Sequence, residues 1–336
     1  MAQPHILIVG AGSVGKRHLR NFAGLGCEAS VCEPRADRRA EAAEAAPLAH
    51  SYADFEAALR DAGRFSGVVI CSPPKFHVDQ ALAALELGLP VFLEKPVSPD
   101  AASAARLAEA LKTSRVPLLL GYTYRWWPPV QELRRRLEAG RVGRVLHVRC
   151  VMSAHLADWH PWERYQDFFM ASRDLGGGAL LDESHMLDLM LWCFGMPEAV
   201  QARVERLSAL EIETDDTVDA LLVYASGLRV NIHLDLYGRP HERSITVVGE
   251  DGTLQWSYER NALRRGQGPS EWEDTPYTCE RNEMFLGAAR EFLELLGGGR
   301  RAPSCTAQDG SEVLQVIEAM RESAASGRMI EMAARC

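Results

Sequence analysis

Three glycines near the start of the chain have the spacing of a nucleotide-binding loop. The pattern G-x-G-x-x-G follows the apolar run 6–9 and consists of Gly10, Ala11, Gly12, Ser13, Val14 and Gly15. In such loops the first glycine permits a tight turn, the second lets the backbone approach a pyrophosphate, and the third lets a helix pack closely on the strand. The N-terminus of that helix presents free N–H groups and its positive dipole end to phosphates. These residues predict a dinucleotide-binding loop.

An acidic residue stands at the distance that such a loop requires. Glu33 ends the segment 28–33, about 20 residues after the glycines. Its carboxylate can accept hydrogen bonds from a ribose 2′-hydroxyl and would repel a 2′-phosphate, which favours NAD. Three arginines follow closely and would suit a 2′-phosphate, so NADP stays open as the alternative; they are Arg35, Arg38 and Arg39.

A lysine at the end of a second apolar strand is the first candidate for proton transfer. Glu94, Lys95 and Pro96 follow the run 91–93, and ligands bind at the carboxyl ends of the strands in parallel sheets. A lysine that loses solvent beside a positively charged nicotinamide is pushed toward its neutral amine, which can exchange a proton with a hydroxyl. An ordinary surface ion pair between Glu94 and Lys95 is the equally weighted alternative.

A glycine run followed by polar residues supplies the second candidate. On one helix over 179–194, Asp182, His185 and Asp188 are three residues apart and share a face. A histidine flanked by carboxylates can carry a proton or bind a substrate, and a polar cluster satisfied inside the core is the alternative. We expect no metal site, because the nearby histidines and acids lack a ligand spacing.

These residues need two kinds of architecture to position them. Residues 1–121 alternate strands and helices, which predicts a doubly wound parallel sheet and an α/β class. From residue 122 the pattern changes to a few helices and long alternating strands, with hairpin signals at 226–227 and 251–252. We therefore predict a second α+β domain over 122–336, built on a large, mostly antiparallel, open-faced sheet.

Composition narrows the class of protein further. The chain has 336 residues and a net charge of −9, which argues against nucleic acid and anionic membranes as partners. It has no apolar run near the roughly 18 residues needed to span a bilayer. It enters its first strand without a signal-peptide pattern, and its eight cysteines are scattered. We expect a cytoplasmic protein with reduced thiols.

In this order the motifs resemble, nearly from end to end, the glucose–fructose oxidoreductase, inositol dehydrogenase and MocA family of NAD(P)-dependent oxidoreductases. The matching stretches are Gly10-x-Gly12-x-x-Gly15 with Arg17-His18, Ser72-Pro73-Pro74-x-x-His77, Glu94-Lys95-Pro96, Gly121-Tyr122-x-x-Arg125 and Gly176–Asp188. The resemblance implies a Rossmann domain over residues 1–121, with a cofactor site that includes Ser13, Val14, Ser72, Pro73, His77, Glu94 and Lys95.

The resemblance also implies the catalytic roles. Lys95 would contact the nicotinamide ribose and the substrate hydroxyl, and His185 would assist or perform the proton transfer. Asp182 is a third candidate, although many members place the acid and the histidine four residues apart and here they are three apart.

A narrower resemblance concerns the aromatic stretch 158–165. It is similar to a subgroup linked to bacterial surface-sugar pathways. Trp159 and Tyr165 have faces that stack on sugar rings, His160 can bind hydroxyls, and Arg125 can bind a carboxylate or phosphate in a bidentate manner. An aromatic plug that covers the sheet is the alternative interpretation.

Together these features predict an NAD(P)-dependent oxidoreductase that acts on a sugar, a polyol or a sugar derivative, with Lys95 and His185 handling the proton. Two alternatives remain: a nicotinamide-binding sensor without turnover, and a net non-redox sugar reaction that recycles bound NAD. A sheet that is apolar on one side needs cover, so we also expect a homodimer or homotetramer through the sheet of residues 122–336.

Overall fold

The computed structural model describes residues 3–159, 163–300 and 302–332 of the chain. Within these residues no helix combines the length and the apolar character needed to cross a membrane.

The chain divides into two compact units. The first contains Met1–Thr123 and Asn282–Ser311, and the second contains Tyr124–Arg281 and Glu312–Cys336. The predicted division at residue 121 differs from this in one respect, because residues 282–311 belong to the first unit. Helix α9 (Asn282–Leu296) packs there against α1 (Ser13–Gly24), with the rings of Phe22 and Phe292 6.2 Å apart.

The first unit is built on a six-stranded sheet in which every neighbouring pair is parallel. Its strands, in the order in which they lie, are β3 (Ser51–Tyr52), β2 (Glu28–Cys32), β1 (His5–Val9), β4 (Gly67–Ile70), β5 (Val91–Glu94) and β6 (Leu118–Gly121). All five residues of β1 are buried, as expected for a strand covered on both faces. The strand order reverses between β1 and β4, which is where such sheets bind ligands.

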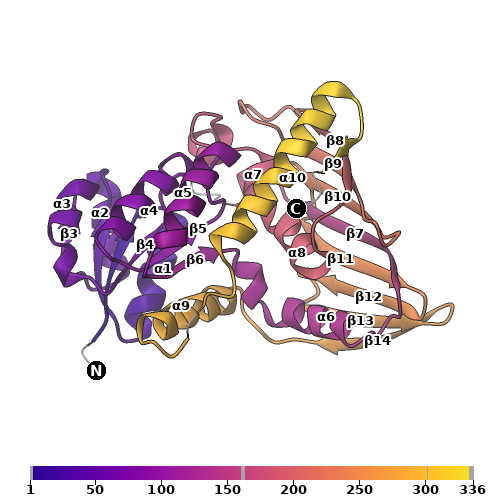
Figure 1. Cartoon of the computed structure of the whole chain (residues 1–336), viewed down its shortest axis with the longest axis horizontal. Coiled ribbons are helices and arrows are strands. Elements are labelled where there is room, and N and C mark those ends of the chain that lie inside the picture. The colour runs from indigo at the N-terminus through magenta and orange to yellow at the C-terminus, as the bar shows by residue number, and fades with distance from the viewer. Residues whose placement is uncertain (1–2, 160–162, 301, 333–336) are drawn as a thin grey trace. The chain divides into compact units, whose positions relative to one another are not determined.

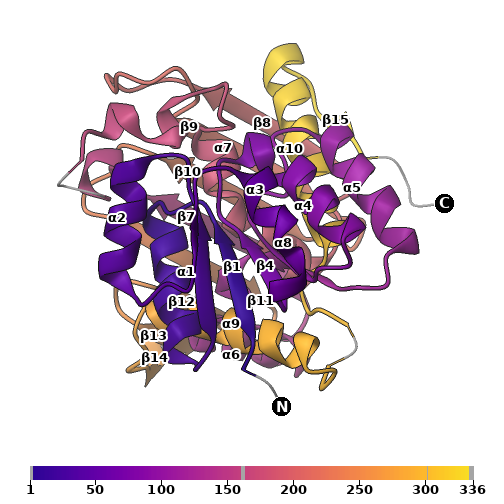
Figure 2. The ribbon, with the colours of Figure 1, turned by 90° about the vertical axis from the view of Figure 1, so that its left-hand side faces the viewer.

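Helices cover both faces of this sheet. Figure 2 shows α1 and α2 on one side of β1 and β4, and α4 and α5 on the other. The connecting elements are α2 (Ala36–Ala45), α3 (Phe55–Arg60), η1 (Ala62–Arg64), η2 (Pro74–Phe76), α4 (His77–Glu86) and α5 (Ala101–Thr113). The predicted doubly wound parallel sheet is confirmed.

The second unit is built on a nine-stranded sheet. Its strands, in order, are β14 (Glu271–Pro276), β13 (Ala262–Gln267), β12 (Gly252–Ser257), β11 (Glu242–Gly249), β7 (Val145–Ser153), β10 (Arg229–Asp235), β9 (Thr217–Val223), β8 (Ala199–Glu205) and β15 (Ile330–Glu331). Only β7 and β10 pair in parallel, so the predicted mostly antiparallel sheet is confirmed.

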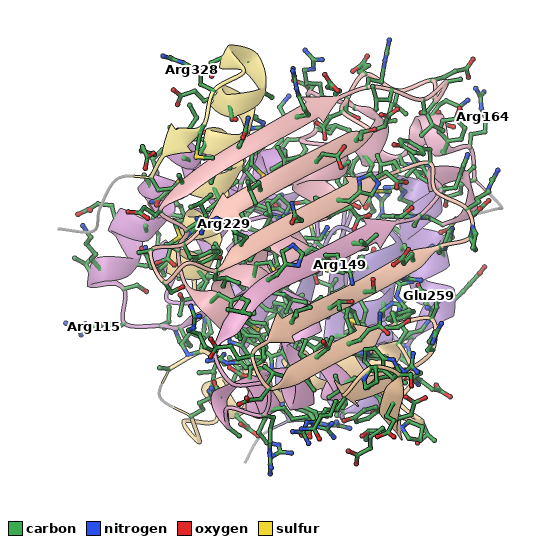
Figure 3. All side chains as sticks on the ribbon, turned by 90° about the vertical axis from the view of Figure 1, so that its right-hand side faces the viewer. Arg115, Arg149, Arg164, Arg229, Glu259 and Arg328 are labelled. Carbon is green, nitrogen blue, oxygen red and sulfur yellow. The ribbon has the colours of Figure 1, made fainter. Side chains whose placement is uncertain are left out.

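The two faces of this sheet differ. Alternate apolar side chains such as Val148, Leu222 and Val230 are fully buried, on the face that the helices of the unit cover (Figure 1). These helices are α6 (Pro128–Glu138), α7 (Ala179–Asp182), α8 (Ser184–Phe194) and α10 (Ala307–Ser326), of which α10 begins in the first unit. Figure 3 shows the other face free of helices, with Arg149 and Arg229 on it.

Two predictions about the second unit need correction. The helix expected over 179–194 is broken at Glu183 into α7 and α8, because the Glu183 carbonyl accepts the amide of Met186 in a tight turn. Strands β13 and β14 were not expected, since their residues are largely charged and partly exposed. The irregular stretch before α7 holds three short helices, η4 (Leu156–Asp158), η5 (Tyr165–Asp167) and η6 (Phe169–Ala171), and η3 (Thr123–Trp126) joins β6 to α6.

Candidate active site

The glycine loop has the geometry that a dinucleotide requires. A Cβ on Gly15 would lie 1.9 Å from the carbonyl oxygen of Gly10, so helix α1 can pack this closely only with glycine there. Gly10 has a φ of +89° and lies against Cys71 and Ser72. A Cβ on Gly12 would meet no atom of the described chain within 4 Å, and no side chain caps the helix at this residue. The first turn of α1, where Ser13 and Val14 are exposed, therefore faces open space with its N–H groups available.

Glu33 lies beside this loop at the end of β2. It is only 4% exposed, and its carboxylate accepts hydrogen bonds from the amides of Ala11 at 2.8 Å and Arg35 at 3.0 Å. Two of the three neighbouring arginines have other partners: Arg39 donates to the Glu33 and Pro34 carbonyls, and Arg35 pairs with Asp37. The local charge thus favours a ribose diol over a 2′-phosphate.

The loop after β4 is held by a buried histidine. Ser72 and Pro73 follow this strand, and His77 begins α4. The imidazole of His77 lies with Nε2 2.8 Å from the Ser72 carbonyl oxygen and Nδ1 2.7 Å from that of Pro96. Burial lowers its pKa, while the two carbonyl contacts oppose that shift. His77 therefore joins two loops at the carboxyl edge of the sheet.

Glu94 and Lys95 lie at the same edge, at the end of β5. Glu94 is 8% exposed and accepts a hydrogen bond at 2.7 Å from Nε2 of His18 in α1. The alternative of an ordinary surface ion pair does not suit a carboxylate this deeply buried. Lys95 is half-buried, and the peptide bond that joins it to Pro96 is cis. The structure thus brings all the predicted cofactor residues of the first unit to one edge of one sheet.

The predicted polar residues after the glycine run lie on two helices rather than one. Asp182 ends α7, is 6% exposed and donates its amide to the Gly178 carbonyl. His185 lies in α8, where the ring of Tyr124 meets it edge to face with centroids 5.0 Å apart. Asp182 and His185 therefore do not share one helical face. Burial raises the pKa of Tyr124 to about 12, so this phenol stays neutral near neutral pH.

Arg125 is bound to Asp188 in a buried ion pair. Its Nε and Nη2 donate to the two carboxylate oxygens at 3.0 and 2.7 Å, and both side chains are less than 5% exposed. Arg125 also lies over the ring of Trp192, 5.6 Å from its centroid. Tyr124 and Arg125 are neighbours in η3, so they hold α8 at His185 and at Asp188, one turn apart.

Asp215 is a residue of this region that the sequence did not reveal. Its carboxylate accepts the amide of Leu180 at 2.8 Å, and its carbonyl accepts the amide of Ala179. Gly178 has a φ of +112°, and a Cβ there would lie 2.5 Å from Asp215 Oδ1. Burial raises the pKa of Asp215. It fixes the glycine turn before α7. In the sequence, however, it lies among other acidic residues, a pattern that is typical of a solvent-exposed segment.

The aromatic stretch is only partly described. Trp159 directly follows η4 and is half-buried, and the Tyr165 hydroxyl accepts the amide of Glu211 at 3.3 Å. His160, a predicted substrate residue, lies outside the described residues. Arg239 anchors the start of this stretch by a bidentate pair with Asp158. The role of Trp159 and Tyr165 in binding a substrate stays a prediction.

With this geometry in view, the chain can be compared with known proteins. A model of the oxidoreductase family with an NAD-binding Rossmann fold matches residues 5–122, and the GFO/IDH/MocA C-terminal domain matches residues 130–255. The first unit is thus an NAD-binding Rossmann domain of an oxidoreductase. The chain belongs to the Gfo/Idh/MocA family, as the motifs predicted.

Individual relatives agree with this assignment. An inositol 2-dehydrogenase from Corynebacterium glutamicum is 35% identical over 146 residues, which span 42% of this chain and 43% of the relative, less than half of its length. Inositol 2-dehydrogenase 1 from Saccharopolyspora erythraea is 28% identical over a match that covers 97% of this chain and 95% of that enzyme. The solved structure of a levoglucosan dehydrogenase with NADH and levoglucosan shares the fold, with a TM-score of 0.86 and 20% sequence identity. The match covers 98% of this chain and 99% of that dehydrogenase.

Proposed function

We propose that this protein is an NAD-dependent dehydrogenase that oxidises a hydroxyl-bearing carbon of a sugar, a polyol or a sugar derivative. One observation carries the proposal: the glycine loop, Glu33 and Lys95 all lie at the carboxyl edge of one parallel sheet, around the point where the strand order reverses. The names of the relatives, inositol 2-dehydrogenase and levoglucosan dehydrogenase, support a polyhydroxylated substrate.

The chain's own residues fit NAD. The open side of Gly12 leaves room for a pyrophosphate at the uncapped start of α1, and Glu33 is placed to accept a ribose hydroxyl. Each oxygen of the Glu33 carboxylate has a further acceptor position, so it can accept a ribose hydroxyl while it keeps the amides of Ala11 and Arg35. Bound NAD supplies the hydride acceptor for the substrate carbon.

Lys95 is the proposed proton carrier, and His185 is its proposed partner or substitute. An amine can take the hydroxyl proton as the carbon is oxidised, and a neutral imidazole can do the same. Asp182 is retained as a further catalytic candidate. It lies at the end of α7, whereas His185 lies on α8.

The proposed substrate residues are Trp159, His160 and Tyr165, whose rings suit a sugar. Arg125 was predicted to bind a substrate carboxylate or phosphate, but its guanidinium is already bound to Asp188. A substrate carboxylate or phosphate would have to displace Asp188, and separating a buried pair leaves an uncompensated charge at a cost of about 3–5 kcal/mol. We infer that Arg125 holds α8 in place.

The proposal is tested by absorbance at the NADH band with a panel of free sugars, inositols and nucleotide-activated sugars, each with NAD and with NADP. Lys95→Ala is the test variant. Lys112→Ala is its matched control, because Lys112 is exposed in α5 and pairs with its helix neighbour Glu109. We expect NAD reduction by wild type and by Lys112→Ala, and a loss of at least 100-fold in Lys95→Ala.

Other outcomes select other functions. Equal activity of Lys95→Ala would overturn the role of Lys95. Sugar conversion without net NADH would indicate a reaction that recycles bound NAD. Tight NADH binding without conversion of any sugar would indicate a sensor.

We also propose that the chain forms a homodimer or homotetramer through the open face of the nine-stranded sheet. That face differs from the apolar surface we expected, because most apolar side chains of its strands face the helices. It carries a hollow of about 470 Å³ lined by Arg149, Asn231 and His233, with Val151 and Leu221 among them. Such a mixed surface suits a polar interface between copies. Light scattering at micromolar concentration should give a multiple of 37.2 kDa, and a monomer mass would refute the proposal.

A further inference from the structure

Two buried histidines hold the residues on either side of Lys95. His18 in α1 donates to Glu94, which precedes Lys95, and His77 in α4 lies against the carbonyl of Pro96, which follows it. Both imidazole rings are completely buried. We propose that His18 and His77 are positioning residues that fix the backbone of Lys95. The proposal rests on the proton-carrying role of Lys95 given above.

The contact on the Glu94 side ties this loop to the dinucleotide helix. The ring of His18 is walled by Phe92 and Phe285, with centroids 4.8 and 5.8 Å away. Its Nδ1 has no hydrogen-bond partner among the described residues, so the contact with Glu94 is the polar anchor of the ring. The other oxygen of Glu94 accepts the amide of Lys95 at 3.3 Å. The backbone of Lys95 is therefore linked through one carboxylate to α1, whose first turn faces the proposed pyrophosphate.

On the other side of Lys95, His77 joins the loop after β5 to the loop after the neighbouring strand β4, because its ring lies against the carbonyls of both Pro96 and Ser72. A neutral imidazole has one N–H and can donate to either the Pro96 or the Ser72 carbonyl, whereas the imidazolium donates to both. Every protonation state of His77 therefore holds at least one of these loops to α4. Because β4 and β5 are adjacent and parallel, the two carbonyls belong to loops that leave the same edge of the sheet.

This arrangement suits a residue that must deliver a flexible amine to one place. Lysine has four rotatable side-chain bonds, so an accurate position for Nζ requires at least a fixed backbone. A shift of about 1 Å in a reacting group can cost about 100-fold in rate. Histidines that only stabilised the fold would not affect the surroundings of Lys95 when the protein remained folded.

The chain offers a matched control for a buried histidine. His5 is 7% exposed, and Nε2 of its ring lies 2.8 Å from the Ser30 hydroxyl. Burial lowers the pKa of His5, as it does that of His77. However, His5 begins β1 at the amino edge of the sheet, opposite to the edge that carries Lys95. The His5→Asn variant therefore reports the general cost of losing a buried histidine.

The first measurement needs no substrate. The chain has only four lysines, so reductive ¹³C-methylation gives a few dimethyl-lysine NMR signals, and Lys95→Arg identifies the signal of Lys95. We expect His77→Ala and His18→Asn to shift or broaden that signal in the protein without cofactor. His5→Asn should leave the signal at its wild-type position and width. Circular dichroism confirms that each variant is folded.

The second measurement is turnover of the sugar found with wild type. We expect kcat to fall about 10–100-fold in His77→Ala, with a less than threefold change in the KM of the sugar. His77→Asn keeps one N–H donor near the Pro96 carbonyl and should recover part of kcat. His5→Asn should stay within about twofold of wild type.

The outcomes separate this inference from the proposed function. An unmoved Lys95 signal in folded His77→Ala overturns the inference, whatever the activity of Lys95→Ala. An inactive Lys95→Ala with a normal kcat in His77→Ala also overturns it and leaves the proposed function standing. A fully active Lys95→Ala overturns the proton-carrying role of Lys95, while the NMR signal still decides whether the histidines fix the backbone of Lys95.

Discussion

Loss of the negative charge of Asp188 should strongly destabilise the second unit. Asp188 and Arg125 are 1% and 4% exposed as side chains, and they share two hydrogen bonds of 2.7 and 3.0 Å. A hydrogen bond between charged groups contributes about 1.5–3 kcal/mol, and removing one partner of a buried pair costs about 3–5 kcal/mol. Asp188→Asn keeps one acceptor oxygen in a side chain of nearly the same shape, so we expect it to lower the free energy of unfolding by about 3 kcal/mol, the lower end of this range.

This free energy is measurable as a change in melting temperature. For a domain of this size, 1 kcal/mol corresponds to about 2–4 °C, so Asp188→Asn should lower the melting temperature by about 6–12 °C. Circular dichroism or differential scanning fluorimetry would record the change. Glu250→Gln is the matched control, because Glu250 accepts from Arg144 at the same 2.7 Å while both side chains are at least half exposed. Exposed pairs contribute about 0–1 kcal/mol, so this variant should melt within about 4 °C of wild type.

The double variant Arg125→Met, Asp188→Leu tests the reasoning further. It removes both charges, leaves no uncompensated ion, and should recover most of the stability that Asp188→Asn loses. If Asp188→Asn melted together with Glu250→Gln, the buried pair would contribute nothing that an exposed pair does not. The inference that Arg125 holds α8 would then be wrong.

Three further outcomes follow from other contacts. Hydrogen bonds, first to Asp235, raise the pKa of His233 to about 9, so the charged imidazole stabilises the fold. This stabilisation is complete below pH 6.5 and is lost as the pH rises through 9. Because the side chain is 37% exposed, we expect a difference of about 1 kcal/mol in the free energy of unfolding by urea between pH 6.5 and 9.5, and none in His233→Gln. Gly12→Ala should keep the melting temperature of wild type but bind NADH at least tenfold more weakly in a fluorescence titration, because its Cβ would occupy the open side of the loop. Gly15→Ala should not fold stably, because its Cβ would clash with the Gly10 carbonyl. Glu33→Ser should improve the ratio of kcat/KM for NADP to that for NAD by at least tenfold, and an unchanged ratio would show that this carboxylate does not select the cofactor.

The first unit was predictable because its signals are local. The burial of β1, the glycine spacing and the acidic residue at Glu33 lie within a single strand–helix–strand segment, and each follows from a rule about one turn or one strand. The role of His18 was not predictable in this way. Its partner Glu94 is 76 positions away, and nothing in the sequence around either residue distinguishes a buried pair from two solvated side chains.

The second unit was harder to predict, for three physical reasons. Strands β13 and β14 carry charges on both faces at the exposed edge of the sheet, so they lack the apolar alternation that reveals a strand. Helix α9 lies in the stretch 122–336 that was assigned to the second domain, but its position in the chain does not say which surface it covers, and Phe292 packs with Phe22 inside the first unit. The break at Glu183 also has no breaker residue to announce it.

That break changes how the polar residues after the glycines should be understood. Spacing alone groups Asp182, His185 and Asp188 on one helical face, which makes a flanked histidine the natural hypothesis. In the structure Asp182 ends α7, whereas on α8 His185 meets the ring of Tyr124 and Asp188 binds Arg125. The carboxylate closest in helical spacing to His185 is therefore already neutralised by an arginine. Because the charge of Asp188 is already balanced by Arg125, Asp188→Asn should change stability more than it changes the pH dependence of kcat.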